Sequence, residues 1–149
     1  MKRRLMPILV IAMSVALLAS CGPTTTRNTN TYVYEESAQE VFDTAIEIGQ
    51  NLAVSSDYER MRINLRSDHS LVLQWHMTPA SYAAAQFFAP AGSPNTQPVT
   101  LTLNTISGSG EATFVTYDAT PYNGRVAIDI ITKFVAEMNG ALTLVEVQE

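Results

Sequence analysis

Four short segments in which apolar and polar residues alternate restrict this chain to folds that contain an antiparallel sheet. In residues 60–66 and 71–77 the apolar side chains occupy every second position, and a polar stretch separates the two segments. Residues 99–104 and 113–119 alternate in the same way on either side of a Ser-Gly-Ser-Gly turn. A period of two residues is that of a strand with one buried face. Each pair of segments therefore predicts a β-hairpin.

The first hairpin has a preferred register, because facing residues must place both apolar sets on one side of the sheet. The pairs that meet this condition are Leu65 with Leu71, Ile63 with Leu73, and Met61 with Trp75. Trp75 is then expected in the core. The opposite face is predicted to carry a basic stripe formed by Arg60 beside His76, Arg62 beside Gln74, and Arg66.

Two segments with helical spacing accompany the hairpins. Ser37 and Glu40 form a capping-box pattern ahead of a helix predicted over about 38–53. A second apolar stripe runs from 126 to 138. Thr120-Pro121 is expected to open this helix as N-cap and first residue, and Asn139-Gly140 to end it. Short strands are predicted at 31–35 and 141–147.

The element order is strand, helix, hairpin, insertion, hairpin, helix, strand. It predicts one α+β domain over 32–149, with an antiparallel sheet of about four to six strands and two helices packed on one face. The layout is similar to the helix-grip domains of some envelope assembly lipoproteins. The insertion covers 78–98. Thr78-Pro79 can start a helix that includes Ala80 to Phe88, and the Pro- and Gly-rich stretch that follows predicts a loop.

The first residues indicate export. A cationic start, Met1 to Arg4, precedes an uncharged and mostly apolar run from Leu5 to Ala19. As a helix this run would be about 22 Å long, which is short for a bilayer core of about 30 Å. Such a pattern is typical of a secretory signal.

Leu18-Ala19-Ser20-Cys21 resembles the lipobox of bacterial lipoproteins. The resemblance implies that the signal, 1–20, is removed and that Cys21 carries a diacylglycerol on its thiol and an acyl chain on its new amino group. Two or more chains hold a protein firmly on a membrane, whereas one binds marginally. Many members retained in the inner membrane have Asp after the cysteine. Gly22 at that position implies the outer membrane, with the domain facing the periplasm.

The segment that follows is a predicted tether. Residues 22–31 contain almost no apolar side chain to bury, which is typical of a flexible linker. Ten residues reach at most about 35 Å when fully extended. The domain is therefore expected to stay close to the membrane.

Charge and cysteine content exclude several functions. Removal of Lys2, Arg3 and Arg4 leaves 6 basic against 14 acidic residues, a net charge of −8. An acidic domain is repelled by nucleic acid, so we expect no nucleic-acid partner. Cys21 is the only cysteine, so no intrachain disulfide or thiolate metal cluster can form.

No motif in the chain predicts catalysis or a cofactor. Asp68-His69-Ser70 has the residue types of a hydrolytic triad, but sequence neighbours in a tight loop are ordinary turn residues. Gly108-Ser109-Gly110 lies between two strands, whereas a nucleophile elbow connects a strand to a helix. A hydrolase would need His69 or His76 beside a serine and an acid. Two histidines without clustered carboxylates make a poor metal site.

Two groups of residues remain as candidates for partner binding. One is the basic stripe of Arg60, Arg62, Arg66 and His76, which could dock an acidic partner or serve only as a solvated sheet face. The other comprises the aromatic side chains of the insertion, Tyr82, Phe87 and Phe88, which could contact a partner or fold down as a lid on the sheet.

The expected function is that of a membrane-anchored, non-catalytic envelope lipoprotein, an accessory or adaptor for another envelope protein or complex. The alternative is a periplasmic module that binds a small amphiphile or glycan in a cavity gated by 78–98.

Overall fold

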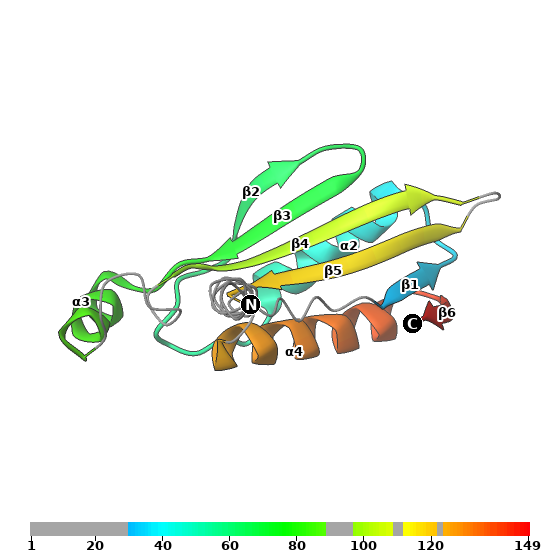
Figure 1. Ribbon diagram of the computed structural model, residues 1–149. Coiled ribbons are helices and arrows are strands. Elements are labelled where there is room, and N and C mark those ends of the chain that lie inside the picture. The colour runs from blue at the N-terminus through cyan, green and yellow to red at the C-terminus, as the bar shows by residue number, and fades with distance from the viewer. Residues whose placement is uncertain (1–29, 89–96, 109–111, 122–123) are drawn as a thin grey trace, which may run out of the picture.

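The structure is a computed structural model that describes residues 30–88, 97–108, 112–121 and 124–149. Its centre is one six-stranded antiparallel sheet in the order β2-β3-β4-β5-β1-β6 (Figure 1). The strands are β1 (Thr31–Tyr34), β2 (Arg62–Arg66), β3 (Ser70–Trp75), β4 (Val99–Ser107), β5 (Thr113–Thr120) and β6 (Leu144–Gln148). The helices are α2 (Ala38–Asn51), α3 (Pro79–Phe88) and α4 (Arg125–Ala141). The predicted α+β fold class is confirmed.

The core lies between the sheet and the helix pair α2 and α4, which contact each other and the central strands. Along β3 and β4 every second side chain is buried, as the alternation predicted. Trp75 is among the most deeply buried residues of the protein. Each fully buried large apolar side chain contributes about 1.5–3 kcal/mol to folding, so the single helix-covered face supplies the main stabilisation.

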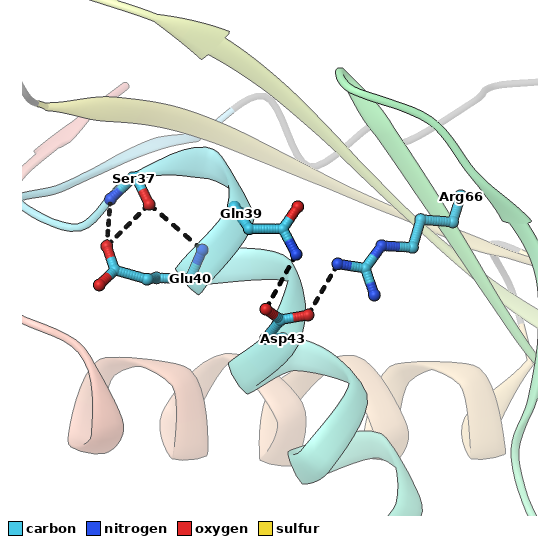
Figure 2. Close-up of polar contacts among 5 residues, drawn as sticks. All are labelled: Ser37, Gln39, Glu40, Asp43 and Arg66. Atoms are coloured by element: carbon cyan, nitrogen blue, oxygen red, sulfur yellow. Dashed lines mark hydrogen bonds and ion pairs between the residues drawn. The ribbon is translucent and has the colours of Figure 1, made fainter.

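The start of α2 forms as its sequence predicts. The Ser37 hydroxyl accepts the Glu40 N–H at 3.4 Å, and the Glu40 carboxylate accepts the Ser37 N–H at 3.0 Å (Figure 2). These reciprocal bonds satisfy two donors that the first turn would otherwise leave open. The helix ends at Asn51, two residues earlier than predicted, because Leu52 is already extended.

Both predicted ends of α4 are wrong. Thr120 does not cap the helix, because it is the last residue of β5 and pairs with Thr100 of β4. The helix instead begins at Arg125, with Gly124 as its N-cap. At the other end Gly140 lies inside the helix. The chain leaves through Leu142, whose extended backbone donates its N–H to the Met138 carbonyl and whose side chain is buried.

The register of the first hairpin follows the prediction in one half only. Ile63 faces Leu73 and Arg62 faces Gln74, as predicted. A register shift between Ile63 and Leu65 then places Leu65 opposite Val72 and Arg66 opposite Leu71, so the predicted pairing of Leu65 with Leu71 is wrong. One extra residue in a strand moves the following side chains to the other face of the sheet.

A buried polar network ties β1 to β5 and α4. The Tyr34 hydroxyl lies 2.9 Å from the Tyr117 hydroxyl and donates to Asn139 Oδ1 at 2.7 Å. Since Tyr34 has only one hydroxyl proton, Tyr117 must donate in the bond between the two tyrosines. Burial raises the pKa of Tyr34 to about 12 and also raises the pKa of Tyr117. Both phenols therefore stay neutral at physiological pH.

Candidate functional site

The three arginines of the predicted basic stripe do not share one face. The shift in β2 turns Arg66 toward the helices, where it donates to Asp43 of α2 at 2.7 Å (Figure 2). Arg62 pairs with Glu59, and Arg60 is exposed. His76 is half-buried, and its carbonyl accepts the Glu59 N–H. The continuous stripe is thus a wrong prediction, because the bulge interrupts the alternation and acids neutralise two of its members.

The contact between Arg66 and Asp43 is an exposed structural link between β2 and α2. Asp43 also accepts a bond from Gln39 at 2.9 Å, and this bond, together with Arg66, lowers the pKa of Asp43. Exposed pairs of this kind add little to stability because water screens them. The pair nevertheless engages the guanidinium of Arg66, one of the candidate residues for docking an acidic partner.

The aromatic residues of the insertion lie on α3, which forms over the residues that the sequence predicted. Figure 1 shows α3 beyond the ends of β3 and β4, away from the helix pair that covers the sheet. None of its residues is buried. Phe87 is 88% exposed and Phe88 91%, and Tyr82 is also exposed. The alternative in which these side chains form a lid on the sheet is therefore wrong.

The base of α3 is fixed to the body, whereas the side chains of its last two residues are exposed. Thr78 donates its N–H to the Asp57 carbonyl at 2.8 Å, and the Ser81 hydroxyl donates to Asp57 Oδ1 at 2.8 Å. Tyr82 continues the first turn by donating its N–H to the Thr78 carbonyl. The side chains at the tip are thus presented on a helix whose start is held by one segment of the domain.

The sequence around α3 carries a further signal, which is compositional and belongs to no motif. No Lys, Arg, Asp or Glu occurs between Asp68 and Glu111, a span of 42 residues that includes β3, α3 and β4. Charged residues make up 15% of the chain, so about six would be expected in a span of this length. The absence of charge is thus concentrated where the exposed aromatic side chains lie.

The two edge strands of the sheet differ in how they are protected. Each contains a bulge, at the register shift between Ile63 and Leu65 in β2 and at Val145 in β6, but β2 also carries an arginine at each end, a common means of blocking a further strand. β6 reads Leu-Val-Glu-Val-Gln, contains neither a basic residue nor a proline, and is exposed along its whole length. Within the described residues no strand pairs with its outer edge. Val145 is 57% exposed there.

A cleft of about 500 Å³ lies between the base of α3 and the start of α4. Its apolar lining includes Met77, Ala85 and Val99, and its polar lining comprises the acid Asp57, Tyr58 and the base Arg125. A second cleft, of about 440 Å³, lies between α2 and α4. The first cleft is the arrangement closest to the ligand cavity expected beside the insertion.

The described residues contain no assembled hydrolytic site. The Ser67 hydroxyl accepts the backbone N–H groups of His69 and Ser70, which is ordinary turn chemistry. Neither His69 nor His76 bonds through its ring to a serine or an acid in the described part of the chain. Ser109 and Gly110 lie outside the described residues. Among those that are described, no three His, Cys, Asp or Glu residues form a set able to hold a metal ion.

No protein-family model matches the chain, and no curated protein sequence is significantly similar to it. In the described parts of the chain, no helix has both the length and the apolar character that a membrane crossing requires. Cys21 and the predicted tether up to residue 29 lie outside the described residues.

Proposed function

We propose that this protein is a lipid-anchored, non-catalytic accessory protein of the bacterial envelope that docks to another envelope protein. The lipobox-like Leu18-Ala19-Ser20-Cys21 supports the anchor. The excess of acids in the mature chain disfavours nucleic acid as the partner. With Gly22 after the cysteine, the proposed location is the outer membrane, on its periplasmic side.

The contrast between the two sheet edges is the observation that carries the docking proposal. A protein that folds alone usually protects both outer strands, because an open edge pairs with other chains. Here both edge strands contain a bulge, but β2 is also protected by an arginine at each end, whereas β6 presents Leu144, Val145 and Val147 beside a single acid, Glu146. We infer that β6 receives an extended segment of the partner, whose backbone continues the sheet and whose alternate side chains meet these apolar residues.

A pair of matched lysine substitutions tests the docking edge. Val145→Lys places on β6 the charge that commonly protects an edge strand, and Leu65→Lys makes the same change on β2, where Leu65 is 50% exposed. Each variant carries a photoreactive residue at Glu146, is expressed in cells, and is cross-linked before mass spectrometry. We expect the parent and Leu65→Lys to capture the same envelope protein. Val145→Lys should capture at least about tenfold less of it, which corresponds to a loss of about 1.4 kcal/mol in binding free energy.

Three results would count against the docking proposal. Equal capture by both lysine variants would show that β6 is not the docking edge. Cross-links that form only between copies of this chain would show that β6 is a homodimer interface and not a site for another envelope protein. Capture of no defined protein by the parent would leave the open edge without a partner and reject the adaptor function.

The cleft beneath α3 supports a second candidate, a module that binds a small amphiphile. It combines an apolar lining with Asp57, Tyr58 and Arg125, an arrangement suited to an acyl chain with a polar head group. Native mass spectrometry of the protein extracted from membranes would show a bound molecule, and Ala85→Trp, which fills the cleft, would remove it. A parent protein that carries no molecule would reject this candidate.

A further inference from the structure

We propose that α3 is a second membrane contact, in which Phe87 and Phe88 insert into the surface of the bilayer that holds the lipid on Cys21. This inference rests on the lipid anchor of the proposed function. The occupant of the exposed helix is therefore a lipid surface, and the docking edge β6 remains available to a protein partner.

The first argument is the chemistry of the helix tip. Two adjacent phenylalanines that are each about nine-tenths exposed present a large apolar area to water. α3 contains no charged residue and no buried one. A protein interface of this size usually surrounds its aromatic centre with a polar and charged rim. The tip of α3 lies within a stretch of 42 residues without charge, and the charged side chains near the helix, Asp57 and Arg125, lie at its start and along the cleft beneath it, so the tip itself suits contact with lipid.

The second argument is the direction from which the chain enters the sheet. Thr31 pairs with Thr116, and Tyr34 with Thr113, so β1 runs away from the end at which β5 finishes. That end, marked by Thr120, is also where β3 leads into α3 (Figure 1). The residues that precede Thr31 thus join the domain from the side on which α3 lies.

The third argument is reach. From the level of Thr31 to that of Thr120 is four residues along β5, or about 14 Å at 3.4 Å per residue. The ten residues from Cys21 to Thr31 span at most about 35 Å, which leaves about 20 Å beyond the end of the sheet. The three residues between Trp75 and α3 add at most about 10 Å, and the ten residues of α3 about 15 Å, so the tip of α3 lies at most about 25 Å beyond the end of the sheet. The reach of the tether is therefore of the same order as that of α3, as contact with one bilayer surface requires.

Such a contact would orient the domain. Figure 1 shows β1 and β6 toward the end of the sheet opposite α3. With α3 against the lipid, the open edge of β6 is held away from the membrane surface and faces a partner. A single flexible tether would leave the domain free to tumble, whereas two contacts fix which side it presents.

A fluorescent probe beside the phenylalanines tests the proposal in the intact protein. Cys21 is the only cysteine, and its thiol is occupied in the lipidated form, so Gln86→Cys accepts an environment-sensitive label at one position. The lipidated protein is placed in phosphatidylcholine vesicles with nitroxide-labelled acyl chains as quenchers. A label at Ser107→Cys serves as the control, because that residue lies eight residues along β4 from Val99, about 27 Å.

We expect the emission of the label at residue 86 to shift to shorter wavelength and to be quenched by the lipid, and that of the label at residue 107 to do neither. The double variant Phe87→Ser with Phe88→Ser should lower the equilibrium constant for insertion of α3 into the bilayer about a hundredfold. Each phenylalanine that is buried in lipid contributes a factor of about ten or more to that constant. Both side chains are almost fully exposed, so this variant keeps the core. The matched variant Ile106→Ser, which also removes an exposed apolar side chain, should leave the signal unchanged.

Flotation of the vesicles separates the two proposals. Protein that floats while the label at residue 86 behaves as in water overturns the insertion of α3 and leaves the anchor intact. Protein that does not float overturns the anchor and, with it, this inference. A photoreactive residue at Phe88 that captures a protein rather than lipid in cells would also overturn it, because the occupant of α3 would then be a protein.

Discussion

Loss of the Tyr34 hydroxyl should destabilise the fold more than loss of the Tyr117 hydroxyl, although the two groups bond to each other. Tyr34→Phe removes two hydrogen bonds and leaves the buried Tyr117 hydroxyl without an acceptor and Asn139 Oδ1 without its donor. An unsatisfied buried group costs about 1–3 kcal/mol. Tyr117→Phe removes one bond, at about 1 kcal/mol, and Tyr34 still donates to Asn139.

The double variant tests whether Tyr117 donates its hydroxyl proton to Tyr34. With both hydroxyls absent, no orphaned donor remains at residue 117, so Tyr34→Phe with Tyr117→Phe should cost less than the sum of the single changes by about 1 kcal/mol. The assay is urea unfolding, followed by circular dichroism, of the chain expressed without residues 1–20 and with Cys21→Ser. Additive costs, or a larger cost for Tyr117→Phe than for Tyr34→Phe, would refute the assigned direction of the hydrogen bonds.

The same pair predicts a loss of stability at alkaline pH. Burial raises the folded-state pKa of Tyr34 from 10.0 to about 12 and raises that of Tyr117. A raised folded pKa means that the stabilisation is fully present below pH 10 and is lost as the pH rises toward 12, because the unfolded chain ionises first. The urea midpoint of the parent should therefore fall between pH 9 and pH 11. The double variant, which lacks both phenols, should lose less over the same interval.

Four further changes test the packing and the helix start. Phe134→Ala should cost about 3–5 kcal/mol in urea unfolding, because its side chain is fully buried between helix and sheet; a cost below 1 kcal/mol would contradict the assigned core. Ser37→Ala should cost about 1 kcal/mol through loss of the cap, and Arg66→Ala, which breaks only an exposed ion pair, should cost less. Hydrogen bonds from Ser37 lower the folded-state pKa of Glu40 below 4.5, so this stabilisation is present above that pH and lost as the pH falls through the folded value. The acid-side fall in stability should accordingly be shallower in Glu40→Gln, and an unchanged slope would contradict the capping role.

The parts of the fold that the sequence predicted correctly depend on local patterns. The capping box of Ser37 and Glu40 acts within one turn, and the alternation along β3 and β4 reports directly on burial. Pro79 as the first residue of α3 is another local signal. The structure that such a pattern favours depends on residues close together in the sequence, so it can be predicted without knowledge of the tertiary fold.

The errors come from features that only the assembled sheet decides. Nothing in the composition of residues 62–66 marks the register shift that turns Arg66 toward Asp43. Thr120 has the residue type of a helix cap, yet its backbone pairs with Thr100 because β5 continues to that point. Gly140 stays helical because Leu142, two residues later, is the residue that packs into the core.

The candidate surfaces were only partly predictable. The sequence singled out Phe87 and Phe88, but whether α3 would pack on the sheet or extend from it depended on tertiary contacts. The charge-free span from 69 to 110 was readable from the sequence and points to the same region. The open edge of β6 could not be inferred, because strand order is set by pairing across the whole sheet.

The anchor at Cys21 is the claim on which both the accessory function and the membrane contact of α3 depend. Intact-mass spectrometry of the protein extracted from bacterial membranes tests it most directly. The account predicts a chain that begins at Cys21 and carries a diacylglycerol and an acyl chain, and it predicts that Cys21→Ser is released from the membrane fraction. A mature chain that begins at another residue, or that contains an unmodified Cys21, would contradict the account.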